Sequence, residues 1–168
     1  MDIASLRGLL LRDLRALRRE IEAYPDDESP WQRLPGLPNA AGNLALHLAG
    51  NLRHYIGARL GGSGYVRDRE AEFSRRGLPR DVLCREVDDA IAVVDRTLAG
   101  LGAAQLDRTF PEPVGGWNLR TGEFLLHLAA HLGYHLGQID YHRRVVTGDP
   151  RTAGAMAVGE LPAAKRAL

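Results

Sequence analysis

Hydrophobic residues recur at helical spacing in four long segments of the chain. These segments span residues 3–24, 39–60 and 79–101, and a stretch that begins between 118 and 121 and ends near 146. Their apolar residues return every three or four positions, as on one face of a helix, and no stretch of useful length alternates with a period of two. The pattern predicts an all-α protein, a four-helix bundle.

Residues that interrupt or cap helices lie at the ends of these segments. Pro25 ends the first helix, and the GGSG run at 61–64 forms a turn that ends the second. Asn39 is a good N-cap for the second helix, and Pro79 suits the first turn of the third. Glycines and prolines crowd residues 102–117, which predicts an irregular connection between the third and fourth helices.

The chain of 168 residues fits one domain, because domains most often hold about 100 to 150 residues. We expect the bundle to occupy residues 1–150. The remaining residues, 151–168, are rich in small side chains and are expected to be a C-terminal tail that is loosely docked or disordered. The charged segment 65–77 is compatible with a short helix or with an ordered loop.

Composition and charge exclude several classes of protein. Hydrophobic residues make up 45% and charged residues 26% of the chain, which excludes a disordered protein. The net charge of +1 and the lack of a basic patch speak against a nucleic-acid partner. The longest apolar stretch without charge, 124–139, is too short for a membrane span. One cysteine, Cys84, and no secretory leader predict a cytoplasmic protein in which Cys84 is a buried small hydrophobe.

All candidate chemistry lies on the second and fourth helices. The segments 40–52 and 124–139 contain no Asp, Glu, Lys or Arg, so both helices should be buried on nearly all sides. Buried imidazoles need partners, because an unpaired buried polar group costs about 1 to 3 kcal/mol. These two helices carry all six histidines of the chain: His47, His54, His127, His131, His135 and His142.

Histidines four residues apart on a helix lean the same way and can bind one metal ion. His127 and His135 lie roughly 12 Å apart along the axis, too far to share an ion with good angles. The spacing therefore leaves two pairs open, His127 with His131 or His131 with His135. His47 is the leading third ligand, since it lies in the middle of the other segment without charge. The alternative is a network of buried histidines that hydrogen-bond without metal.

Two stretches resemble the DinB/YfiT-like metalloenzyme family. The stretch LLHLAAHLGYHLGQID, residues 125–140, resembles the family's signature, in which a His-xxx-His pair directly precedes Gly-Gln. Residues 39–60 and 67–73 are similar to the second-helix region of one branch of that family. The resemblance covers most of residues 1–148. Many members carry Arg before the Gly-Gln, where this chain has Leu136 and so lacks a polar group near the site.

The resemblance implies a four-helix bundle, commonly dimeric, in which one residue of the second helix and two of the fourth hold a divalent metal. On this chain those ligands would be His47, His131 and His135. His127 is then a supporting histidine one turn outside the pair. Asn51 and Gln138 are candidates to hydrogen-bond a ligand or a metal-bound water, and the histidines farther along, His54 and His142, are expected in packing or on the surface.

The function implied is that of a metal-dependent enzyme. Zn²⁺ or Ni²⁺ would activate water or a thiol as a nucleophile. Relatives use low-molecular-weight thiols such as mycothiol or bacillithiol, so transfer or hydrolysis of a small-molecule substrate is expected. The buried segments offer no acidic general base, which favours a thiolate over hydrolysis. We expect the charged run at 67–72 to be a charged helix end rather than the rim of the metal pocket. The alternative function is a non-catalytic, stress-associated dimer that binds metal.

A ridge of small residues on the fourth helix bears on assembly. Ala129, Gly133 and Gly137 recur every four residues, on the side away from the histidines. Small side chains let another helix approach closely. This face is therefore expected to pack against another helix of the same chain or against a second copy, and we expect a two-fold homodimer.

Overall fold

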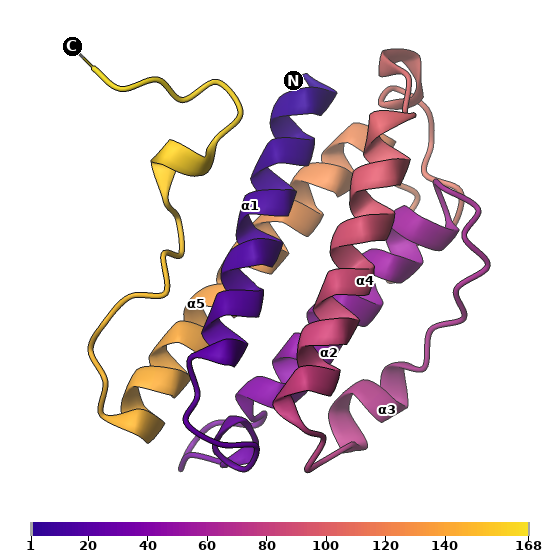
Figure 1. The fold of residues 1–168 in the computed structure, drawn as a ribbon. Coiled ribbons are helices and arrows are strands. Elements are labelled where there is room, and N and C mark those ends of the chain that lie inside the picture. The colour runs from indigo at the N-terminus through magenta and orange to yellow at the C-terminus, as the bar shows by residue number, and fades with distance from the viewer. Residues whose placement is uncertain (1, 168) are drawn as a thin grey trace.

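The computed structural model describes residues 2–167, and every regular element among them is helical (Figure 1). The all-α class predicted from the sequence is confirmed. The α-helices number five rather than four in this part of the chain, because segment 65–77 contains a short helix. The helices are α1 (Ile3–Glu22), α2 (Ala41–Leu52), α3 (Arg69–Ser74), α4 (Arg80–Ala99) and α5 (Thr121–Thr147).

The four long helices enclose one core. α1 and α2 each contact both α4 and α5, and α3 packs against α2. Leu10, Leu14 and Leu17 of α1 are fully buried there, each burial stabilising the fold by about 1.5 to 3 kcal/mol. Cys84 is buried, as expected of a small hydrophobe.

The second helix differs from its predicted bounds at both ends. Its N-cap is Ala40, whose side chain makes no capping bond, rather than Asn39. After Leu52 the chain continues as a π-helical segment, Arg53–Ala58, in place of regular α-helix. A π-turn holds more residues than an α-turn, so residues beyond Leu52 rotate out of register with the face that carries His47.

The connection from α1 to α2 is tied to the rest of the molecule by Trp31. Its indole Nε1 donates to the carbonyl of Leu78 at 2.9 Å. A Cβ at Gly42 would lie 2.8 Å from the indole ring, so only glycine lets the ring lie this close to α2. The segment that follows Trp31 is thereby held near the start of α2.

A buried polar layer joins α1 to the C-terminal half of α5. Arg143 Nε donates to Glu20 Oε2 at 2.5 Å, and neither side chain is more than 1% exposed. His142 uses both ring nitrogens, with the Tyr24 hydroxyl at 2.7 Å and the carbonyl of Gln32 at 2.8 Å. This layer fixes the position of α5 along α1, which also fixes the histidines on α5.

The residues after α5 run beside α1 (Figure 1). Arg19 of α1 donates to the carbonyls of Ala153 and Gly154 and pairs with Glu160 at 3.1 Å. These contacts hold part of segment 151–167 against the bundle.

No helix of the described residues is long and apolar enough to cross a membrane.

Candidate metal centre

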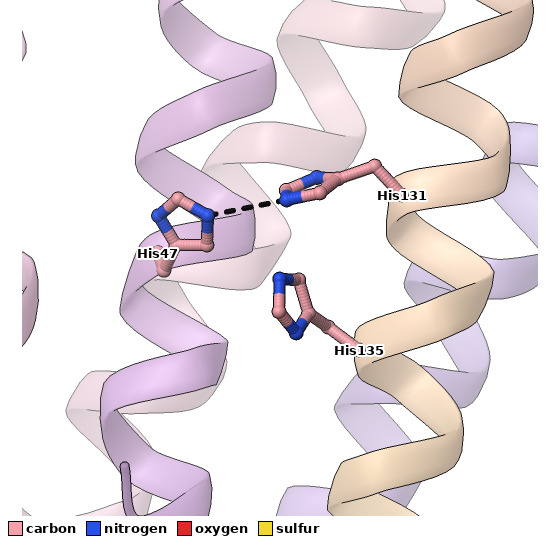
Figure 2. Close-up of side chains that lie close together, drawn as sticks. All are labelled: His47, His131 and His135. Atoms are coloured by element: carbon pink, nitrogen blue, oxygen red, sulfur yellow. Dashed lines mark hydrogen bonds between the residues drawn. The ribbon is translucent and has the colours of Figure 1, made fainter. Parts of the chain in front are cut away.

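Three histidines from two helices converge on one point. His47 of α2 faces His131 and His135 of α5, and the three rings point toward one another (Figure 2). One ring nitrogen from each lies within 4.8 Å of those of the other two. Of the two pairs that the spacing left open, the structure thus brings His131 and His135 together with His47.

The distances suit a divalent ion. Nε2 of His47 and Nε2 of His131 are 3.3 Å apart. Two imidazoles on a tetrahedral ion at about 2.0 to 2.1 Å place their nitrogens about 3.3 Å apart. The ring nitrogens of all three histidines lie within 4.8 Å of one another. A small movement of one side chain would bring the three nitrogens to the separations of a tetrahedral site.

Glu72 of α3 orients His47. Its Oε2 lies 2.9 Å from His47 Nδ1, and Arg67 donates to both carboxylate oxygens, at 2.7 and 2.8 Å. Burial alone would raise the pKa of Glu72, but hydrogen bonds from Arg67 and His47 outweigh it and lower the pKa below its usual value. An ionised carboxylate only accepts, so Nδ1 of the neutral His47 imidazole donates to Glu72, and its Nε2 carries the lone pair that faces the other two rings. Arg67 Nη2 lies farther from Nδ1, at 3.2 Å, and makes its hydrogen bond to Glu72 instead.

On the other side of the cluster, Gln138 orients His135. His135 Nδ1 donates to Gln138 Oε1 at 2.6 Å, which leaves the second ring nitrogen of His135 free to bind a ligand. Burial, the neighbouring histidines and Arg67 lower the pKa of His131 to about 4. Burial also lowers the pKa of His135, although the bond to Gln138 partly offsets this. These two imidazoles are therefore neutral at pH 7, the form that binds metal.

The donor set fits a His-ligated divalent metal. Three neutral imidazoles with an open fourth position are typical of catalytic Zn²⁺ sites, and imidazole also suits Ni²⁺. One turn from His47, on the same face of α2, Asn51 is only 7% exposed, and its Oδ1 has no hydrogen-bond partner among the described residues. A buried acceptor without a partner costs about 1 to 3 kcal/mol, a cost that a bound group with a proton to donate would remove.

The other histidines lie outside the cluster. His127 is exposed, and its ring stacks between those of Phe124 and His131, with centroids 6.0 and 6.2 Å away. His54 lies in the π-helical segment and pairs with Glu112 at 2.8 Å, away from His47. His142 belongs to the buried layer under α1.

Glu72 does not lie where it was expected. The run 67–72 was expected to be a charged helix end, yet Glu72 is 5% exposed and bonds directly to His47. Gly50 of α2 makes this possible, because a Cβ there would overlap the Glu72 carboxylate. The only local signal is a glycine within an apolar helix that precedes an acidic segment.

Comparison with known proteins places the chain in a family. Neither curated protein sequences nor solved structures gave a match to the chain. The DinB superfamily matches residues 9–139, a range that contains all three histidines of the cluster as well as Glu72. The match covers well over half of the sequence, and the chain therefore belongs to the DinB superfamily.

Proposed function

We propose that this protein is a divalent-metal-dependent enzyme whose ion is held by His47, His131 and His135. The four long helices would be the bundle of the DinB superfamily, and α3 an additional helix that supports the site. The observation that carries the proposal is the convergence of three imidazoles, two of which are oriented by hydrogen bonds. His47 Nδ1 donates to Glu72, and His135 Nδ1 donates to Gln138. Carboxylate and amide partners of this kind orient metal-binding histidines in known sites.

A bound Zn²⁺ or Ni²⁺ would lower the pKa of a water or a thiol and so supply a nucleophile at neutral pH. The residues around the cluster favour a thiol. Glu72 is ion-paired with Arg67 and hydrogen-bonded to His47, which lowers its pKa and makes it a poor base toward water. Asn51 Oδ1 can accept a hydrogen bond, yet an amide is no general base. We therefore propose a thiol-dependent transfer, in which the sulfur of a low-molecular-weight thiol forms a bond to an electrophilic small-molecule substrate and the substrate takes up the thiol proton, with hydrolysis as the less favoured reaction.

The ligand set is tested by metal analysis of protein purified without a His-tag, followed by calorimetric titration with Zn²⁺ and Ni²⁺. His47→Ala, His131→Ala and His135→Ala should each lose about 3 kcal/mol or more of binding free energy, more than a hundredfold in affinity. His127→Ala is the matched control on α5 and should bind as the wild type does. Full occupancy in His135→Ala, with loss in His127→Ala and His131→Ala, would place the site one turn away. Acidification should release the ion, and retention well below pH 5 would argue against histidine ligands.

A structural role for the ion is the second candidate, because His47 and the two histidines of α5 come from different helices that an ion would join. A non-catalytic, stress-associated binding protein would use the ion in this way. Thermal unfolding separates the two functions. A structural ion should raise Tm strongly at saturating metal, whereas a catalytic ion should raise it modestly and support thiol-dependent turnover.

A further inference from the structure

A cavity of about 370 Å³ adjoins the metal centre. It lies between the segment that leads into α2 and the C-terminal half of α5. His135 and Gln138 form part of its wall, so the cavity begins at a residue of the three-histidine cluster. Its volume falls in the lower part of the range of small-molecule sites, about 300 to 1,000 Å³.

The lining of the cavity is apolar and uncharged. Leucines, a proline, a valine and two tyrosines form most of its surface, and no Asp, Glu, Lys or Arg of the described residues lines it. A charged ligand would lose its hydration there without gaining a partner, which costs far more than the same transfer of an apolar group. The lining thus selects a neutral and largely apolar molecule.

Besides the two tyrosine hydroxyls, the polar residues in the wall are Asn39, His135, Gln138 and His142. His142 contributes only its ring, because both of its nitrogens are bonded to Tyr24 and Gln32. Gln138 uses its Oε1 for His135, so its amide N–H groups remain to donate. A ligand with an acceptor atom would place that atom beside Gln138 and hence beside His135.

The outer wall is accessible from solvent. Tyr134, Tyr141 and Val145 line the cavity, and each is more than 60% exposed. The two tyrosines are seven residues apart on α5, so they lie on the same face of the helix. Aromatic side chains of this kind stack well on flat apolar groups.

We propose that this cavity binds the apolar body of the second substrate, a neutral and predominantly aromatic or aliphatic compound, with its reacting polar end at His135 and Gln138. This assignment rests on the proposed function, because it makes the three-histidine cluster the reacting end of the cavity. The cluster binds the nucleophile, and the cavity selects the acceptor.

The cavity is tested with N-phenyl-1-naphthylamine, a neutral aromatic fluorophore that brightens in apolar sites. Val145→Glu places a charge in the wall and should weaken binding of the probe about tenfold or more. Val158→Glu is the matched control, since Val158 is an exposed valine that does not line the cavity. Both side chains are exposed, so neither change should prevent folding. The anionic analogue 8-anilinonaphthalene-1-sulfonate should bind the wild type more weakly than the neutral probe.

Proximity to the metal is tested by adding Ni²⁺, which quenches a nearby fluorophore. Quenching in the wild type and its loss in His47→Ala support the proposal. Absence of probe binding, or equal binding of the probe to Val145→Glu and Val158→Glu, overturns this assignment. If calorimetry still detects Ni²⁺ binding in that case, the proposed function stands. Ni²⁺ that binds without quenching also overturns the assignment, because the cavity would then be remote from the ion.

If calorimetry detects no Ni²⁺ binding, the proposed function fails and this assignment fails with it. A dimer that Val145→Glu converts to monomer, together with no probe binding, would show that a second copy covers the cavity.

Discussion

Glu72 determines which nitrogen of His47 is available to a metal ion. Its carboxylate accepts from Nδ1, so the lone pair of Nε2 faces His131 and His135. Arg67 balances the charge of the carboxylate and holds it in place through two hydrogen bonds. Glu72 is therefore a positioning residue: it acts on the site through His47 and does not contact a bound ion itself.

Replacing Glu72 should weaken metal binding without removing a ligand. Glu72→Gln keeps the size of the side chain but loses its charge and the strong acceptor for His47 Nδ1. Loss of such an oriented partner typically lowers metal affinity about 10- to 100-fold. Glu70→Gln is the control, since Glu70 is exposed on the same short helix. Calorimetric titration with Zn²⁺ checks the effect, and equal affinities for the two variants would contradict the positioning role.

At the scale of the element, Gly50 couples α2 to α3. Asn43 of α2 donates to the carbonyls of Glu72 and Arg75 at 2.9 and 3.0 Å, which fixes α3 against α2. The lack of a side chain at Gly50 then admits the Glu72 carboxylate. A glycine in a helix costs about 1 kcal/mol relative to alanine, so this contact is made at the expense of helix stability.

Gly50→Ala should improve helix propensity and still damage the site. The added methyl group overlaps the Glu72 carboxylate, so we expect a loss of about 1 to 3 kcal/mol in stability and a lower affinity for Zn²⁺. Gly100→Ala is the control, because a Cβ there meets only backbone oxygens of Arg96 and Thr97 at 3.8 Å. Urea unfolding and metal titration of both variants measure the effects. A Gly50→Ala protein as stable as the wild type, with unchanged affinity, would show that Glu72 can move at no cost.

Helix α5 should make the metal-free protein sensitive to mild acid. Burial lowers the pKa of His131, His135 and His142 in the folded state, that of His131 to about 4. As pH falls below about 6.5, the unfolded chain takes up protons that the folded chain does not, so stability declines. For His131 alone we expect a loss of about 1 to 2 kcal/mol between pH 7 and pH 5. Urea unfolding at both pH values measures it, and His131→Gln should show a smaller loss. A pH-independent free energy of unfolding over this range would contradict the prediction.

At the scale of the whole molecule, the long helices could be predicted because their apolar periodicity directly reflects burial. The convergence of His131 and His135 with His47 followed from their spacing together with the family resemblance. The support of the site could not be predicted in this way. The burial of Glu72 depends on two residues more than twenty positions earlier in the chain. Asn43 hydrogen-bonds the backbone of Glu72, and Gly50 leaves space for its carboxylate. The π-helical segment that separates His54 from the cluster could not be predicted either, because it does not change the spacing of the hydrophobic residues.

Part of α5 is left uncovered by the described residues, 2–167. Of the three small residues predicted to form a ridge on this helix, Ala129 is buried, and Gly133 and Gly137 face open space. A Cβ at either glycine would meet nothing within 4 Å among the described residues. Leu126 is exposed seven residues before Gly133, on the same face of the helix. Such a surface combines close backbone access with apolar side chains, the composition that helix-to-helix interfaces use.

We propose that two copies of the chain associate through this face of α5 as a two-fold dimer. Light scattering at micromolar concentration should then give twice the 18.4 kDa mass of one chain. Gly133→Leu should convert the dimer to a folded monomer, because the new side chain finds open space within its own chain but keeps a second helix away. Gly159→Leu is the matched control, since a Cβ at Gly159 also meets nothing within 4 Å among the described residues and Gly159 lies outside α5, in the short helix Val158–Glu160. A wild-type mass of one chain would reject the dimer, and a dimeric Gly133→Leu protein would place its interface on another face.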